Sequence, residues 1–392
     1  MARSRTRTKP QTKELSVAID LGGSLTKAVA TDIDGDYCFL AIAPEILEVQ
    51  DQMLQMYSSR SAGLGSEIDW ISYNGAKYVW GKTVRNVFGG LNNLKTLKSD
   101  TSLGIPKILA LIFLLKQKYQ AKNLSLRLAI LLPCTEFISG SKESFMVALR
   151  ESFSLISSSQ GEFEVDLEDL NIFPEGAGAY ISYSKVLGQE VKQLDIGVST
   201  LGYRNINYFL VQNAVPNKFY GNYLGFSSIV RQVSEYLGTT NGGHLATLVF
   251  MAGVEPDVQS CESLLAQCPN AAQVTAASLH AHLCSLIDEY QRKIQLWFEQ
   301  TVDSYPHHII FTGGTLEYLQ PVLSKLVPSS AKLVANPGYI PSLKLFEKSL
   351  ITDIHGLYGP EKRFIDVFSI FLFQLDKDES YRSLTTQFIS QQ

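Results

Sequence analysis

A strand–turn–strand pattern with a glycine-rich turn constrains this chain more than any other feature. Near the N-terminus, an apolar run over residues 15–20 ends in Leu21-Gly22-Gly23-Ser24, and a second strand-like run follows over residues 25–31. This order differs from the strand–glycine loop–helix of a Rossmann or P-loop unit. The pattern recurs over residues 191–211, around Asp195-Ile-Gly197-Val-Ser199-Thr200. Two copies so far apart predict two related lobes and not a solenoid of short repeats.

The composition is that of a globular protein with two ordinary domains. The chain has 392 residues and a mass of 43.5 kDa, with 45% hydrophobic and 18% charged residues. A formal net charge of -4 argues against a body that mainly coats nucleic acid. The five cysteines show no Cys-x-x-Cys spacing, which suits a reducing, cytoplasmic compartment. The longest apolar stretch, residues 105–115, is shorter than the ~20 residues of a membrane span, so no membrane contact is expected.

Residues 1–13 form a basic N-terminal stretch. Its charged residues alternate with polar or small ones: Arg3, Arg5, Arg7 and Lys9. We expect a solvated, disordered tail. Contact with DNA phosphates or with an acidic partner is the alternative.

Apolar periodicity and turn residues predict the remaining elements. We expect helices over residues 105–120, 227–237 and 315–326 and within 271–305; strands over 37–43, 126–132, 170–173, 191–195, 308–311 and 332–334; and a helix or strand over 364–373.

The turn residues suggest a site for a nucleoside triphosphate. Glycine lets backbone N–H groups approach phosphate oxygens, and carboxylates hold Mg²⁺ through its water shell. The first copy supplies both, with a lysine on the next strand: Asp20, Gly22, Gly23, Ser24 and Lys27. The second copy supplies Asp195, Gly197, Ser199 and Thr200. Each turn alone is also compatible with an ordinary hairpin, whereas two facing turns can clamp one triphosphate.

Two further positions complete the candidate site. Glu175 follows Pro174 at an expected helix start, where it either complements the helix dipole or polarises water. Gly313-Gly314 lies between a strand and a helix, where the backbone either approaches a ligand or simply turns.

Four segments resemble, in order, the phosphate-one, connect-one, phosphate-two and adenosine motifs of the actin, heat-shock-chaperone and sugar-kinase superfamily. They are Val17-Ala-Ile-Asp-Leu-Gly-Gly-Ser-Leu-Thr-Lys27, Phe173-Pro-Glu-Gly-Ala-Gly-Ala179, Leu194-Asp-Ile-Gly-Val-Ser-Thr200 and Ile309-Ile-Phe-Thr-Gly-Gly314. Residues 131–137 and 360–369 are similar to elements of the ParM/StbA-type plasmid-segregation actins, so the resemblance spans roughly residues 15 to 375.

The resemblance implies an α/β, actin-like two-lobe fold. Each lobe would be a mixed β-sheet flanked by helices, with a nucleotide cleft between the lobes. Lobe I would comprise residues 14–188 and lobe II residues 189–345, and residues 346–392 would return to lobe I.

The resemblance also implies a role for each candidate residue, with ATP and Mg²⁺ as cofactors. Asp20 and Asp195 would hold hydrated Mg²⁺, and Glu175 would orient the attacking water. Adenosine would lie against Gly313 and Gly314, with Arg292 or Lys293 beside the base. The phosphates would contact Gly22, Gly23, Ser24, Lys27, Gly197, Ser199 and Thr200.

The implied function is that of a cytoplasmic ATPase that assembles with itself into filaments and positions plasmid DNA or another cargo, through a DNA-bound adaptor protein. Val198 and Gly202 depart from the second phosphate motif and leave hydrolysis and nucleotide preference open. Two alternatives therefore stay open: a small-molecule kinase of the sugar-kinase type, and a nucleotide-binding scaffold that does not hydrolyse.

Overall fold

The structure is a computed structural model. It describes residues 12–61, 68–87, 98, 100–239, 242–268, 271, 273–302, 306–327, 329–354 and 361–378. The chain divides into two compact units, Met1–Gly178 together with Tyr339–Gln392, and Ala179–Gly338. The first boundary lies in the opening turn of helix α6 (Ala177–Leu187), whereas the sequence analysis placed it after residue 188.

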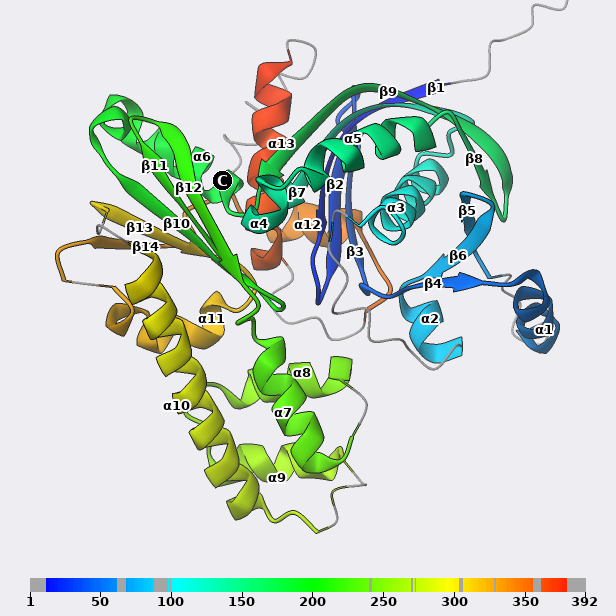
Figure 1. Ribbon diagram of the computed structural model, residues 1–392. Coiled ribbons are helices and arrows are strands. Elements are labelled where there is room, and N and C mark those ends of the chain that lie inside the picture. Colours follow the sequence, from blue (N-terminus) through cyan, green and yellow to red (C-terminus); the bar gives the residue numbers. More distant parts are fainter. Residues whose placement is uncertain are drawn as a thin grey trace, which may run out of the picture. The chain divides into compact units, whose positions relative to one another are not determined.

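The first unit is built on a ten-stranded mixed β-sheet (Figure 1). From edge to edge its strands are β15 (Leu350–Thr352), β3 (Tyr37–Ile42), β2 (Thr26–Asp32), β1 (Thr12–Leu21), β7 (Asn123–Leu132), β9 (Gly161–Pro174), β8 (Leu155–Ser158), β5 (Ile71–Tyr73), β6 (Ala76–Trp80) and β4 (Ile46–Val49). The central strands β1 and β7 pair in parallel and are buried along most of their length. Their continuous apolar runs are typical of strands that are covered on both faces.

Helices cover both faces of this sheet. They are α1 (Asp51–Ser61), α2 (Lys82–Val87), α3 (Gly104–Lys118), α4 (Cys134–Phe137), α5 (Ser141–Ser152), α12 (Leu343–Ser349) and α13 (Ile365–Lys377). Strand β3 shows the two faces, because successive side chains of a strand point to opposite sides. Cys38 and Leu40 join the apolar cluster around α3, whereas Phe39 packs on Phe346 of α12 and Phe368 of α13. Within the residues that the structure describes, no helix has the length and apolar character needed to cross a bilayer.

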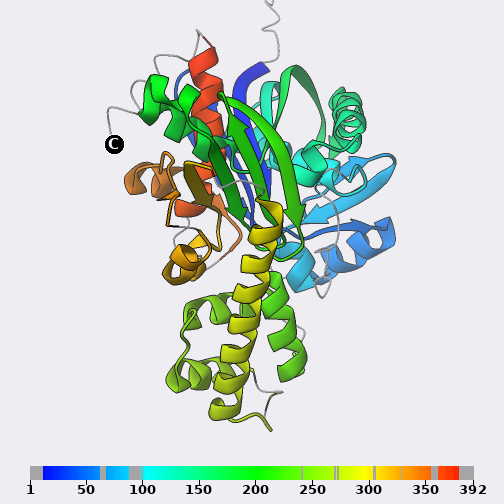
Figure 2. The ribbon, with the colours of Figure 1, turned by 60° about the vertical axis from the view of Figure 1, so that its left-hand side comes forward.

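The second unit has a five-stranded sheet with a group of helices at one end (Figures 1 and 2). In sheet order the strands are β12 (Val215–Asn222), β11 (Ile206–Gln212), β10 (Ile196–Leu201), β13 (His308–Thr312) and β14 (Lys332–Ala335). After α6, most of which belongs to this unit, its α-helices in the described part are α7 (Ser227–Leu237), α8 (Gly242–Ala252), α9 (Val258–Ala266), α10 (Ala276–Thr301) and α11 (Leu316–Leu319). Helix α10 starts at a capping box formed by Thr275 and Ser278 and buries one apolar stripe against its neighbours.

Both units contain the same five-stranded arrangement. Strands β3-β2-β1-β7-β9 and β12-β11-β10-β13-β14 share their order: the first three strands are antiparallel, and the last three are parallel. Hairpin β1–β2 is closed by residues 22–25 and hairpin β10–β11 by residues 202–205. The topology therefore confirms the internal duplication that the sequence predicted.

Three local predictions are wrong. Residues 188–193 form a 3₁₀ helix, and strand β10 begins only at Ile196, so residues 191–195 are not a strand. For the same reason Gly197, Ser199 and Thr200 are strand residues and not a turn. Residues 12 and 13, predicted as part of the tail, belong to β1, while residues 1–11 lie outside the described residues.

The first turn of α6 contacts the first turn of α13, a helix of the C-terminal segment. A Cβ added to Gly178 would overlap the backbone carbonyl oxygen of Asp366. The Gly178 N–H donates to Asp366 Oδ1 at 2.8 Å, and the Gly176 N–H donates to Asp366 Oδ2 at 2.7 Å. These backbone donors lie at a helix start, where they would otherwise lack a partner. The close approach thus requires glycine at position 178.

We expect Gly178→Ala to lower the free energy of unfolding by about 1–3 kcal/mol, because the added methyl group must push the two helix starts apart. Urea unfolding measures this change. Gly140→Ala is the matched control, since a Cβ at Gly140 meets nothing within 4 Å. Equal destabilisation by the two substitutions would contradict the packing described.

Candidate functional site

Strands β1, β7 and β9 of the first unit are parallel, so their carboxyl ends lie on the same side of the sheet. The predicted charged residues gather at these strand ends. Asp20 is the penultimate residue of β1. Glu175 directly follows β9, and its N–H donates to the Leu132 carbonyl of β7 at 2.8 Å. Lys27 is the β2 partner of Asp20, and its Nζ lies 2.6 Å from Asp20 Oδ2. The structure therefore brings Asp20, Lys27 and Glu175 together.

A fourth charged residue, Lys98, joins this group and was missed by the sequence analysis. Its Nζ lies 2.6 Å from Asp20 Oδ1 and also forms an ion pair with Glu175 Oε1. The Lys98 side chain is only 5% exposed. The four residues form a chain of alternating charge in the order Lys27, Asp20, Lys98 and Glu175. Nothing in the sequence signalled this, because Lys98 lies in a polar stretch outside every motif.

The start of helix α3 fixes the backbone of Lys98. A Cβ added to Gly104, the first residue of α3, would overlap the Lys98 carbonyl oxygen. The Gly104 N–H donates to the Asp100 carbonyl at 2.6 Å, and Asp100 Oδ1 accepts the Ser102 N–H at 2.9 Å. A larger residue at position 104 would displace the backbone of Lys98 or the start of α3.

Burial and ion pairing oppose each other in this group. Burial raises the pKa of Asp20, but attraction to Lys27 and Lys98 outweighs it and holds the Asp20 pKa below its usual value. Burial lowers the pKa of Lys98, but Asp20 and Glu175 outweigh it and hold the Lys98 pKa above its usual value. For Glu175, burial and the nearby Asp20 raise the pKa, and Lys98 offsets only part of this. Lys98 is therefore the group that favours the ionised form of Glu175.

Two residues of the C-terminal segment approach the site from η5 (Lys362–Phe364) and α13: Arg363 reaches the β1–β2 turn, and Asp366 reaches the backbone that follows Glu175. Arg363 donates from Nη2 to Ser24 Oγ at 2.6 Å, and its backbone carbonyl accepts from Lys27 Nζ at 2.9 Å. Burial raises the pKa of Asp366 to about 6, although the hydrogen bond from the Gly176 N–H opposes this. The segment that resembles a connect-two element thus contacts the β1–β2 turn through Arg363. Pro360, the first residue of that segment, lies outside the described residues.

The equivalent turn in the second unit keeps the backbone and loses the charges. Thr200 and Asn207 pair in the register that Asp20 and Lys27 occupy in the first unit. A Cβ on Gly22 would overlap the Leu25 carbonyl oxygen, and a Cβ on Gly202 would lie 2.8 Å from the Asn205 carbonyl oxygen. The Thr200 hydroxyl is buried without a hydrogen-bond partner in the described part of the chain. The second turn can offer a hydroxyl and backbone groups, but no carboxylate at this position.

Asp195 and Gly197 lie toward the other end of β10, away from this turn. Asp195 precedes the strand and accepts from Gln212 Nε2 at 3.0 Å. A Cβ on Gly197 would lie 2.8 Å from the ring of Tyr208, so this glycine serves packing within the sheet. The predicted match of Asp195 with Asp20 is wrong, because strand register matches Asp20 with Thr200.

Ser199 and Thr200 both stay within β10. Ser199 is fully buried and points to the opposite face from Thr200, since adjacent strand residues alternate. Of the residues predicted for the second phosphate turn, only Thr200 therefore lies where strand β10 enters that turn.

The predicted adenosine turn adjoins the β10–β11 turn in the second unit. Gly313 follows β13 directly and has a φ of 109°, a conformation that favours glycine. A Cβ there would overlap the Leu201 carbonyl oxygen, which also accepts the Thr315 N–H at 3.1 Å. Arg292 and Lys293 are exposed on α10, where Lys293 pairs with Glu289, and their place beside a base stays a prediction.

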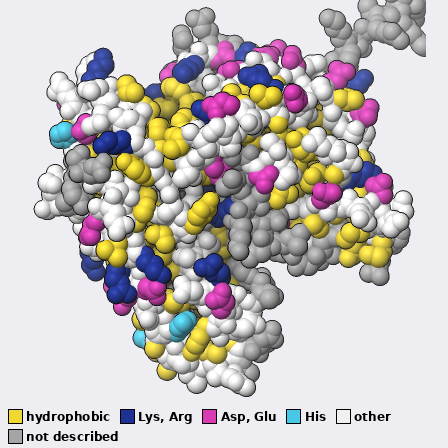
Figure 3. Space-filling view, in the orientation of Figure 1, with side chains coloured by type: hydrophobic (Ala, Val, Ile, Leu, Met, Phe, Trp, Pro, Cys, Tyr) yellow, Lys and Arg dark blue, Asp and Glu magenta, His cyan; other side chains and the backbone are white. Residues whose placement is uncertain are grey.

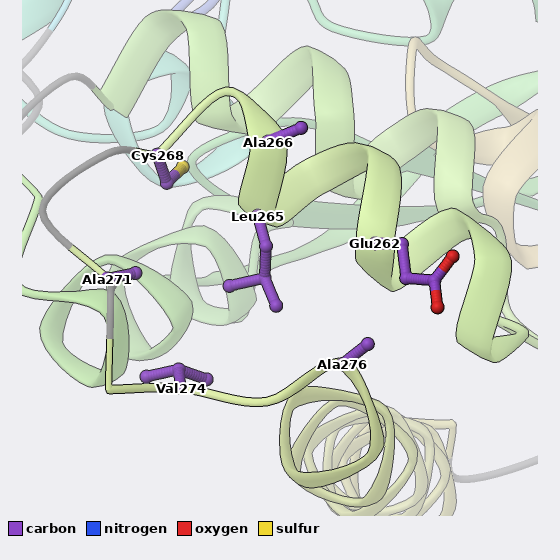
Figure 4. Close-up of a pocket in the computed structure, with 7 residues that line it drawn as sticks. All are labelled: Glu262, Leu265, Ala266, Cys268, Ala271, Val274 and Ala276. Atoms are coloured by element: carbon purple, nitrogen blue, oxygen red, sulfur yellow. The ribbon is translucent and has the colours of Figure 1, made fainter.

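A hollow of about 470 Å³ lies elsewhere in the second unit, between α9 and the segment that leads into α10 (Figure 4). Its described lining consists of Glu262, Leu265, Ala266, Cys268, Ala271, Val274 and Ala276. Small apolar side chains with one carboxylate do not favour phosphate. The hollow shares no residue with the predicted site.

No protein-family model and no curated protein matches this chain. Solved structures do match. A ParM filament protein from Clostridium botulinum has a TM-score of 0.56 and 14% identity over 92% of this chain and 99% of its own. The apo psk41 ParM protein has a TM-score of 0.55 and 13% identity over 94% of this chain and 100% of its own. Ta0583, an archaeal actin homologue, has a TM-score of 0.53 and 14% identity over 91% of this chain and 98% of its own.

The chain has the actin-like fold. This confirms the predicted fold class, with two mixed sheets flanked by helices. At this level of identity the likeness establishes the fold alone, so the roles of residues in this actin-like chain rest on the geometry described above.

We expect Lys98→Met to lower the free energy of unfolding by about 3–5 kcal/mol, because it leaves Asp20 and Glu175 buried with one cation fewer. The double variant Lys98→Met/Glu175→Gln should recover part of this loss, since a neutral amide tolerates burial better than a carboxylate. Urea unfolding of wild type, both single variants and the double variant measures the coupling. Lys293→Met, which breaks an exposed pair, is the control and should leave stability almost unchanged. Additive effects of the two site substitutions would contradict the coupling.

Proposed function

We propose that this chain binds ATP with Mg²⁺ and hydrolyses the ATP. The observation that carries the proposal is the convergence of Asp20, Lys27 and Glu175 beside the Gly22 turn. A glycine turn offers N–H groups to phosphate oxygens, a lysine neutralises them, and a carboxylate holds hydrated Mg²⁺. The archaeal actin homologue Ta0583, with a TM-score of 0.52 and 13% identity, has been solved in complex with ADP, which adds support from a protein of the same fold.

The donor set of this turn fits a magnesium ion. Mg²⁺ prefers oxygen ligands and keeps several waters, and the lysine pairs hold Asp20 in its ionised form. When bound, the ion would neutralise charge on the phosphates. Lys98 contacts the same carboxylate. When hydrated Mg²⁺ binds, the Lys98 ammonium group must share Asp20 Oδ1 with the water shell of the ion or move away from it. We assign the metal to Asp20, because Asp195 lies at the wrong end of β10 and Thr200 carries no charge.

Glu175 is the residue that we assign to the attacking water. Its backbone is held by the hydrogen bond to the Leu132 carbonyl, which fixes the start of its side chain. A carboxylate orients water by accepting a hydrogen bond, and this requires the ionised form. Lys98 favours that form, so it would act as a positioning residue for Glu175.

We also propose that the protein assembles with itself into nucleotide-dependent filaments. The ParM protein from Clostridium botulinum and AlfA from a Bacillus subtilis plasmid have been solved as filaments, with TM-scores of 0.56 and 0.50 to this chain. Head-to-tail contacts that do not close into a ring produce such open polymers. In this proposal the filament acts in the cytoplasm and positions plasmid DNA or another cargo.

The DNA link is assigned to an adaptor protein. On the face seen in Figure 3, positive and negative side chains are interspersed, whereas a surface that tracks a phosphate backbone needs a basic stripe. The basic residues of the N-terminal tail remain an alternative DNA contact, and they lie outside the described residues.

A nucleotide-binding scaffold without hydrolysis is the second candidate function. It is favoured by Thr200, which removes one carboxylate from the position equivalent to Asp20. A sugar-type kinase would need a carboxylate base for a substrate hydroxyl, and no observation singles one out among the described residues.

Sedimentation tests the filament proposal. Purified protein should pellet with ATP·Mg²⁺ or a slowly hydrolysed analogue and should stay in the supernatant without nucleotide. Asp20→Asn should not pellet, because it weakens binding of the metal and its nucleotide. Wild-type protein that remains in the supernatant at high concentration with every nucleotide would contradict filament formation and favour the kinase or scaffold.

We expect Glu175→Ala to lower the rate of ATP hydrolysis at least about tenfold, because positioned acid–base groups typically contribute ~10²–10⁴ in rate. ATP affinity should stay within a few-fold, since Glu175 is not assigned to a phosphate. Phosphate release and equilibrium nucleotide binding measure the two effects, and Glu175→Gln checks that removal of the charge suffices.

Glu143→Ala, which changes a carboxylate 66% exposed on α5, is the control. Unchanged turnover in both Glu175 variants, with a wild type that hydrolyses ATP, would assign the attacking water to another residue. A wild type that binds ATP without hydrolysing it would establish the scaffold.

A further inference from the structure

Arg363 differs from the other cations at the β1–β2 turn. Lys27 is paired with Asp20, and Lys98 is paired with Asp20 and Glu175. Arg363 has no carboxylate at ion-pair distance among the described residues, and the partner of its guanidinium is the neutral hydroxyl of Ser24. Burial lowers the pKa of Arg363, and the negative charge of Asp20 offsets only part of this lowering.

The position of Arg363 is nevertheless well defined. Its backbone carbonyl accepts from Lys27 Nζ at 2.9 Å, and its side chain reaches Ser24 Oγ at 2.6 Å. Phe364, the next residue, is fully buried and packs on Phe39 of β3 at a ring-centroid distance of 5.7 Å. The core therefore holds this guanidinium against the glycine turn.

Arg363 is half-buried, so its charge loses part of its contact with water on folding. Removing a charge from water is unfavourable unless a counter-charge and hydrogen bonds compensate it, and a hydroxyl supplies one hydrogen bond and no charge. A guanidinium carries five N–H donors in a planar fork. Within the described part of the chain one of them is used, in the bond to Ser24, which leaves most of the fork for a planar or tetrahedral oxyanion. Charge-assisted pairs of arginine and phosphate are short and often bidentate.

We infer that Arg363 is a phosphate ligand, which together with Ser24 takes a phosphate group of the bound nucleotide. This inference rests on the proposed function, in which the β1–β2 turn binds a nucleoside triphosphate. It adds a cation from the C-terminal segment to a phosphate site that the sequence analysis built from the turn and Lys27 alone.

The test compares Arg363→Met and Arg363→Lys with Lys362→Met, which removes a charge from the exposed neighbouring residue. Calorimetric titration of the full chain with ATP·Mg²⁺ and with adenosine separates the contribution of the phosphates from that of the base. We expect Arg363→Met to weaken ATP·Mg²⁺ binding by about 10–100-fold, as loss of a charged hydrogen bond implies. Adenosine affinity should stay within about twofold, Arg363→Lys should be intermediate, and Lys362→Met should bind like wild type.

The stability of the nucleotide-free protein distinguishes a phosphate ligand from a structural residue, because only loss of a structural residue should lower it. If Arg363 binds an anion and does not stabilise the nucleotide-free fold, Arg363→Met should unfold at the same urea concentration as wild type or at a higher one. Loss of stability, with equal weakening of ATP and adenosine binding, would show that Arg363 holds the fold and would overturn the inference. Unchanged ATP·Mg²⁺ affinity in Arg363→Met would overturn it as well.

Failure of the proposed function is recognised separately. If wild-type protein binds no ATP, titration with Mg²⁺·pyrophosphate tests Arg363 by itself. Binding by wild type that is lost in Arg363→Met would support an oxyanion site at Arg363, and no binding by wild type would overturn it.

Discussion

The ion pairs of Lys98 allow two buried carboxylates, Asp20 and Glu175, to lie together at the ends of the strands of the first sheet. Asp20 lies near the end of β1 and Glu175 directly follows β9, with β7 between the two strands. Two buried carboxylates so placed oppose each other's ionisation. The Lys98 ammonium lies between them and makes two negative charges tolerable. Its own position depends on Gly104, which admits the Lys98 carbonyl to the first turn of α3. A role for Glu175 in orienting water therefore rests on a residue that belongs to none of the recognised motifs.

The two units share a sheet and differ in charge. Gly22 and Gly202 occupy equivalent turns, and both are needed because a carbonyl oxygen lies where a side chain would begin. The paired positions beside these turns hold Asp20 with Lys27 in the first unit and Thr200 with Asn207 in the second. The duplication has thus kept the backbone geometry while the charged chemistry is concentrated in the first unit. The missing carboxylate in the second unit is the observation that favours a scaffold without hydrolysis as the second candidate function.

Local sequence signals predicted the fold well where apolar residues form a continuous run, as in a buried strand, or a stripe at helical spacing, as in α7. The β1–β2 hairpin, α7 and the strand before Gly313 follow the predicted ranges closely. Asp195 misled the prediction because Asp-x-Gly occurs at both places in the sequence, whereas only strand register shows which residue stands at the turn.

Long-range contacts were beyond the reach of the sequence. Lys98 and Arg363 come from separate segments, with no spacing or periodicity that ties them to Asp20 or Ser24. Only the closure of the sheet by α3 and by the C-terminal segment brings them to the turn. Glu175 could be predicted because a short motif surrounds it, but its ion pair could not.

Isothermal titration calorimetry with ATP, in the presence and absence of Mg²⁺, tests most directly whether the β1–β2 turn is the phosphate and metal site. Wild-type protein should bind one ATP·Mg²⁺ per chain. Asp20→Asn should bind it at least about tenfold more weakly, and the loss should be larger with Mg²⁺ than without, because the carboxylate acts through the metal. Equal affinities of wild type and Asp20→Asn for ATP·Mg²⁺, or no binding by wild type, would contradict this assignment.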